Sequence, residues 1–189
     1  GGGGGYAQPY AQPFAEPFTR PFAYRPEYVG MASYEYRPSA QISANVREEI
    51  TRSLVSLGYG RGSINAQQEQ QLRQYLAQTD LMRVVSSELR SRGYEPNSVA
   101  TALSYWLITN YNIIHGTTSS DSQDAAVLRQ AQTLLDQQGE MARLSDGEKQ
   151  RAAEGLYWVA TLQQYAYQEA RAGTPGFDLN SVVADAHAA

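Results

Sequence analysis

A proline at every fourth position restricts the start of the chain more than any other feature of the sequence. After five glycines, the units Tyr6-Ala-Gln-Pro, Tyr10-Ala-Gln-Pro, Phe14-Ala-Glu-Pro and Phe18-Thr-Arg-Pro follow without a break, and Phe22-Ala-Tyr-Arg-Pro continues them with one inserted residue. Each proline removes a backbone donor and keeps the preceding residue out of the helical region. Residues 1–40 are therefore predicted to form an extended N-terminal arm, without a helix or a central strand.

The arm is also rich in rings, with six tyrosines and three phenylalanines among its first 36 residues. Pro-rich and Gly-rich tracts are often disordered linkers, but such linkers are usually poor in aromatic residues. Each ring that becomes buried is worth roughly 1.5–3 kcal/mol. The arm is therefore predicted to lie on a surface. Its predicted subunit-interaction residues are Tyr6, Tyr10, Phe14, Phe18, Phe22, Tyr24, Tyr28, Tyr34 and Tyr36.

Three surfaces could receive this arm: copies of the same protein, the chain's own domain, or another partner. At ~3.1 Å per residue, residues 6–38 reach on the order of 100 Å, which is long for a groove on a domain of about 150 residues. We therefore expect the arm to bind copies of the same chain and to form a homopolymer.

The amino-acid composition limits the possible binding partners of the protein and its cellular location. The net charge of −4 and the pI of about 5.2 argue against nucleic acid, which needs a basic footprint. The sequence has no cysteine, so disulfides and thiolate metal sites are excluded, and it has no apolar run long enough to span a membrane. It begins with Gly1 and has no signal-peptide core. From this we expect a cleaved leader and a secreted, extracellular or cell-surface protein.

Residues 41–189 are predicted to form one all-α domain, a helical bundle of about six to seven helices. Apolar residues recur at helical spacing, and polar caps and glycines mark the ends of each segment. The predicted starts are Ser43, Asn65, Asp80, the Pro96-Asn97-Ser98 segment, the loop Thr117–Ser122, the capping box Ser145–Glu148, and Asp178. The predicted stops include Gly58, Gly93, Gly116 and Gly173.

Few residues carry recognisable chemistry. His115 is expected at the end of the most apolar helix, and His187 lies near the C-terminus. Two histidines so far apart, without cysteine, form no metal signature. Asn110 and Asn112 interrupt the apolar helix and are interpreted as a buried polar network, with a ligand site as the alternative. We therefore predict no catalytic, cofactor-binding or metal-binding residue; an enzyme would need a pocket that joins Asn110 to His115.

The segment at residues 100–116 resembles a motif of an uncharacterised family of secreted Gram-negative bacterial proteins. Their pattern is similar to Tyr-Trp-x-x-x-Asn-Trp-x-x-x-His-Gly. Residues 148–162 also resemble the C-terminal helix of that family. The resemblance covers roughly residues 41–183 and omits the arm; it implies an exported helical domain without an assigned activity. The matching positions are Tyr105, Trp106, Asn110, His115 and Gly116, with Tyr111 as the aromatic neighbour.

These observations predict a structural subunit of an extracellular filament, similar to a pilus or fimbria, polymerised non-covalently through the arm. An arm that crosses several neighbours ties their interfaces together by avidity. The alternative is a monomeric secreted or periplasmic interaction module whose arm binds another protein or a cell-wall polymer.

Overall fold

The structure is a computed structural model that describes residues 31–188. This range contains seven α-helices and one short 3-10 helix, and its only strand-like feature is an isolated β-bridge. The predicted all-α bundle is therefore confirmed for the described residues. The elements are α3 (Ala40–Gly60), α4 (Ala66–Gln78), α5 (Leu81–Ser91), α6 (Val99–His115), α7 (Asp121–Gln138), η2 (Met141–Arg143), α8 (Asp146–Arg171) and α9 (Leu179–Ala188).

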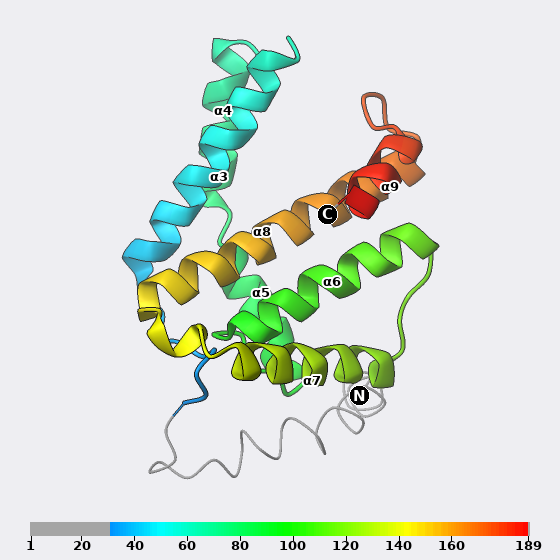
Figure 1. Cartoon of the computed structure of the whole chain (residues 1–189). Coiled ribbons are helices and arrows are strands. Elements are labelled where there is room, and N and C mark those ends of the chain that lie inside the picture. The colour runs from blue at the N-terminus through cyan, green and yellow to red at the C-terminus, as the bar shows by residue number, and fades with distance from the viewer. Residues whose placement is uncertain (1–30, 189) are drawn as a thin grey trace, which may run out of the picture.

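Helices α6 and α8 pack side by side and form the centre of the domain (Figure 1). α7 packs on α6, α3 packs on α8, and α9 contacts both central helices. α3 and α4 form a hairpin that projects from this body, and α4 packs mainly on α3. The buried core is aliphatic and aromatic, and its largest members include Tyr36, Leu128, Tyr157 and Trp158.

Side-chain caps start most helices where the sequence predicted them. Asn65 and Ser145 each accept a backbone N–H from the third helical residue, whose own side chain accepts the N–H of the cap. Asp80 and Ser98 also cap their helices. α7 starts from a further reciprocal box at Ser120, within the segment expected to be a loop up to Ser122. Such caps satisfy amides that the helix itself leaves unpaired.

The predicted start of the first helix at Ser43 is wrong, because a distant side chain caps the helix earlier. α3 begins at Ala40, and the side-chain amide of Gln150 in α8 both accepts the Ser39 N–H at 2.8 Å and donates to the Ser39 carbonyl at 2.9 Å. Ser43 lies inside the helix, where its hydroxyl donates to Glu154 at 2.6 Å. α8 therefore sets the start of α3.

The predicted stop at Gly58 is also displaced, since α3 continues to Gly60. Gly58 has a packing role instead: a Cβ atom there would lie 2.7 Å from Cγ2 of Ile64. The absence of a side chain lets the hairpin loop fold back closely on α3. The turn itself falls at Gly62, whose φ of +67° favours glycine.

The packed domain includes Tyr34 and Tyr36, which lie before the boundary expected at residue 40. Both rings belong to the core, with exposed fractions of 8% and 2%. Residues 34–36 run antiparallel to residues 97–99: the Tyr36 N–H donates to the Asn97 carbonyl at 3.1 Å, and the Val99 N–H donates to the Tyr34 carbonyl at 2.9 Å. We call this segment, Tyr34–Tyr36, the arm root.

Candidate functional site

The nine predicted interaction residues fall into two groups. Tyr34 and Tyr36 are covered by the chain's own helices, and they belong to the core of the domain in this structure. These two rings lie beyond the proline repeat, which ends at Pro26, and the prediction grouped them with the earlier rings because the whole arm is rich in aromatic residues. The other seven lie outside the described residues: Tyr6, Tyr10, Phe14, Phe18, Phe22, Tyr24 and Tyr28.

The arm root is held by a buried aromatic assembly. Tyr157 of α8 donates its hydroxyl to the Pro96 carbonyl at 2.8 Å, next to the segment that pairs with the arm root. Its ring meets Tyr105 of α6 edge to face, with the centroids 5.5 Å apart. Burial raises the pKa of Tyr36 above its ordinary value, and the negative charges of Glu154 and Glu95 add to this effect. The rings and backbone at the arm root therefore form part of the fold itself.

The projecting hairpin exposes large apolar side chains. Tyr75 of α4 is 66% exposed, and Leu57 and Tyr59 at the end of α3 are about half exposed. Tyr59 also donates a hydrogen bond to Glu69 at 3.2 Å, which holds its ring on the hairpin surface. Exposed rings in one region are a common feature of protein contact surfaces. Tyr165 on α8 is exposed as well.

The polar residues that the sequence analysis singled out in the apolar helix, α6, have different surroundings in the structure. His115 ends α6 as predicted; it is exposed and contacts Tyr111, with the ring centroids 4.3 Å apart and the ring planes tilted by 47°. Asn112 belongs to a polar network, since it accepts the Ser119 N–H at 2.9 Å. Asn110 stands apart from that network: its amide donates to the Trp106 carbonyl, and its buried oxygen has no hydrogen-bond partner. Neither Asn110 nor His115 lines the pocket that opens between α5, α6, α7 and α8.

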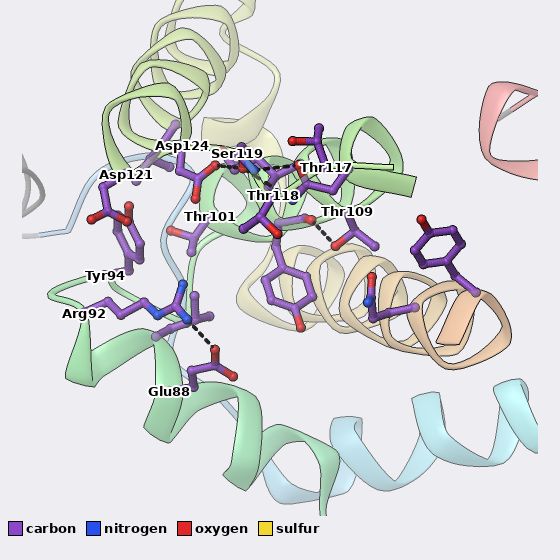
Figure 2. Close-up of a pocket in the computed structure, with 18 of the residues that line it drawn as sticks. Glu88, Arg92, Tyr94, Thr101, Thr109, Thr117, Thr118, Ser119, Asp121 and Asp124 are labelled. Atoms are coloured by element: carbon purple, nitrogen blue, oxygen red, sulfur yellow. Dashed lines mark hydrogen bonds and ion pairs between the residues drawn. The ribbon is translucent and has the colours of Figure 1, made fainter. Parts of the chain in front are cut away.

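A pocket of about 540 Å³ opens between α5, α6, α8 and the start of α7. Figure 2 shows its acidic end, where Glu88, Arg92, Asp121 and Asp124 lie around Tyr94 and Thr101. Glu88 accepts a hydrogen bond from Arg92 at 3.0 Å. The remaining lining is rich in hydroxyl groups and rings: Ser104, Tyr105, Thr109, Thr117, Thr118, Ser119 and Tyr167, with Asn112, Gln164 and Arg171.

The two aspartates at the start of α7 are partly buried, Asp124 more than Asp121. Burial raises the pKa of Asp124, and the neighbouring charge of Asp121 raises it further, while a hydrogen bond from Ser119 and the charge of Arg92 act in the opposite direction. Burial likewise raises the pKa of Asp121. A ligand that donates hydrogen bonds to these carboxylates would replace part of the lost solvation.

Thr101, at the base of the acidic end, is unusual among the helical hydroxyl groups. Thr51, Ser104 and Thr109 each donate to the carbonyl four residues earlier. For Thr101 that carbonyl belongs to Asn97 and accepts the Tyr36 N–H instead. The Thr101 hydroxyl is buried without a hydrogen-bond partner, an arrangement that costs about 1–3 kcal/mol and calls for an explanation.

The sequence did not predict this pocket, because its residues come from four helices and look like ordinary caps and helix surfaces when read in order. The one local signal was the run of hydroxyl residues at 117–120 next to Asp121 and Asp124. Within the described range, no three His, Asp or Glu side chains are grouped so that they could hold a metal ion. None of the helices described has the length and apolar character needed to cross a membrane.

Comparison with known proteins identifies a family but no activity. No curated protein and no solved structure matches the chain. The sequence pattern of a family of unknown function (DUF6683) matches residues 8–189. The match starts at residue 8, so it includes most of the arm, whereas the resemblance noted from the sequence started near residue 41. The chain therefore belongs to the family of unknown function DUF6683.

Proposed function

We propose that the chain is a structural subunit of an extracellular filament, similar to a pilus or fimbria, in which each N-terminal arm packs on neighbouring copies. The observation that carries this proposal is the burial of the arm root, where two rings on extended backbone are covered by helices. The same kind of side chain recurs seven times between Tyr6 and Tyr28. Helical surfaces of a neighbour offer those rings a comparable environment.

The projecting hairpin of a neighbouring copy is the surface we assign to the arm. Tyr59 and Tyr75 expose their rings there, and the hairpin tip points away from the place where the described chain begins, beside the α7–α8 connection (Figure 1). Residues 6–28 can span about 70 Å in polyproline geometry, enough to cross a neighbouring domain. Several weak ring contacts on one arm then add up through avidity.

Two further facts support the proposal. The family match includes residues 8–30, so the arm belongs to the region that the family has in common. The chain has no cysteine, so disulfides do not link the subunits and the contacts between copies are non-covalent. The proposal assigns no catalytic step to the chain.

The test compares the full chain with a form that lacks residues 1–30 and keeps the arm root. The truncated form should remain helical by circular dichroism and sediment as a monomer, while the full chain forms filaments visible by negative stain. Replacing Tyr6, Tyr10, Phe14, Phe18 and Phe22 by alanine should also abolish filaments. Replacing Gln8 and Gln12 by alanine is the matched control and should leave them intact. Filaments from the truncated chain would refute the proposal.

Light scattering separates this function from the alternative of a monomeric interaction module. A full-length chain that stays monodisperse near 20.8 kDa at all concentrations would favour the module. A mass that rises with concentration in the full chain, but not in the five-alanine variant, would favour the filament.

A further inference from the structure

The pocket between α5, α6, α7 and α8 has the size of a ligand site. Its volume of about 540 Å³ falls within the range of ~300–1,000 Å³ typical of small-molecule sites. Its base is formed by α6, and its walls come from helices that are distant in sequence. The loop at residues 117–120 closes one side and is fixed there by Asn112, which bonds both the backbone and the hydroxyl of Ser119.

The charges in the lining nearly balance. Glu88 and Arg92 form an ion pair at 3.0 Å, and Arg171 lies over the ring of Tyr167 at 5.6 Å. Two further carboxylates, Asp121 and Asp124, leave only a small negative excess. A lining of this kind favours a neutral ligand with many hydrogen-bonding groups over a simple cation or anion.

The lining of the pocket offers both hydrogen-bond donors and hydrogen-bond acceptors. Ser104 and Thr109 donate their protons to backbone carbonyls at 2.8 and 2.7 Å, so that toward the pocket their oxygens act as acceptors. The two aspartates accept and the two arginines donate. A hydroxyl group on a ligand can do both, and bonds to charged partners are the stronger ones.

The buried hydroxyl of Thr101 also supports a ligand in this pocket. It is 3% exposed, its hydroxyl has no hydrogen-bond partner, and it lies at the acidic end of the pocket between Asp124 and Arg92 (Figure 2). Its backbone N–H is already used, since it donates to the Ser98 cap at 3.2 Å. A hydroxyl of a ligand could donate to this oxygen and accept from it.

Rings complete the lining. Tyr105 and Tyr167 come from α6 and α8, the two central helices, and both border the pocket. Tyr105 is held in place by its edge-to-face contact with Tyr157. The apolar C–H face of a sugar ring packs well on an aromatic side chain, while its hydroxyl groups point outward to polar partners.

We propose that this pocket binds a neutral saccharide of one or two rings. The hydroxyl groups of the saccharide would bond Asp121, Asp124 and Thr101, and its ring would lie against the tyrosines. This inference does not depend on filament formation, because it concerns a different face of the same domain.

Saturation-transfer NMR on the full chain tests the proposal. The probes are glucose, N-acetylglucosamine and cellobiose, compared with ethanolamine as a cation and inorganic phosphate as an anion. At least one sugar should bind, and T101V and D124N should each weaken its binding at least tenfold. T133V is the matched control, since Thr133 is an exposed threonine on α7 outside the pocket lining.

Each other outcome overturns the proposal. Binding of ethanolamine or phosphate without any sugar would make the pocket an ion site. Sugar binding that T101V and D124N leave unchanged would place the sugar elsewhere. Absence of binding by every probe at tens of millimolar would leave the pocket without this function. Urea denaturation of T101V should show a domain at least as stable as the wild type, which separates loss of binding from loss of fold.

Discussion

Replacing Tyr36 tests whether the end of the arm belongs to the core. The side chain is 2% exposed and packs among the core residues of the central helices. Truncating a buried aromatic residue to alanine costs about 3–5 kcal/mol, because apolar contacts are lost and a cavity remains. Y36A should therefore lower the free energy of unfolding by roughly 4 kcal/mol, which corresponds to about 8–16 °C in Tm for a domain of this size.

Two conservative variants separate the ring from its hydroxyl. The Tyr36 hydroxyl is buried without a hydrogen-bond partner, so Y36F should be as stable as the wild type or more stable by about 1 kcal/mol. The Tyr157 hydroxyl donates to the buried Pro96 carbonyl at 2.8 Å, so Y157F should lose about 1–3 kcal/mol. The expected order of stability is Y36F, Y157F and then Y36A.

Urea denaturation followed by far-UV circular dichroism measures these differences, provided that the variants share one m-value. Y75A is the control, because Tyr75 is largely exposed and its loss should change stability by no more than about 0.5 kcal/mol. A loss below about 1 kcal/mol for Y36A would refute the reasoning, since the arm root would then contribute nothing to the core. Deleting residues 1–36 should destabilise the domain at least as much as Y36A does.

Three further predictions concern the helices. Burial raises the pKa of Glu154 above its ordinary value of 4.5. The contribution of this carboxyl to the stability of the domain is therefore greatest below pH 4.5, and it is lost as the pH rises through the folded-state pKa. E154Q should flatten the stability profile between pH 4.5 and 7 and raise the stability at pH 7, as measured by urea titration. G58A places a Cβ 2.7 Å from Ile64 and should cost about 1–3 kcal/mol, whereas G60A, with open space around it, should be neutral or stabilising by calorimetry. S145A removes the cap of α8 and should cost about 1 kcal/mol in the same assay, and an unchanged Tm would contradict this.

Local patterns predicted the helices well where the capping partners are close in sequence. Ser145 and Glu148 are three residues apart, and the box they form is present as predicted. Ser39 has the residue type of a helix cap, but its side chain makes no cap bond; its backbone is held by Gln150, which lies 111 residues away and which no local pattern could indicate. Tyr34 and Tyr36 continue the aromatic composition of the arm beyond its proline repeat, and their backbone pairing with residues 97–99 depends on a segment more than 60 residues away.

The pocket was beyond sequence reasoning for the same reason. Asp121 and Asp124 are ordinary first-turn acids when α7 is considered alone, and Thr101 is an ordinary third residue after a cap. Their combination depends on how α5, α6 and α8 are placed around them. The hydroxyl of Thr101 is unpaired, and the Asn97 carbonyl four residues earlier accepts the Tyr36 N–H of the arm root.

The position of the arm root also has a mechanical consequence. Among the described residues, a pull on the N-terminus meets the hydrogen bond from Ser33 to Asp136 in α7 and then the bonds that join Tyr34 to Val99 and Tyr36 to Asn97. The next attachment is the Gln150 amide at Ser39, which fastens the start of α3 to α8. Tension along the arm is thus carried by α6, α7 and α8 before it reaches the far end of the projecting hairpin.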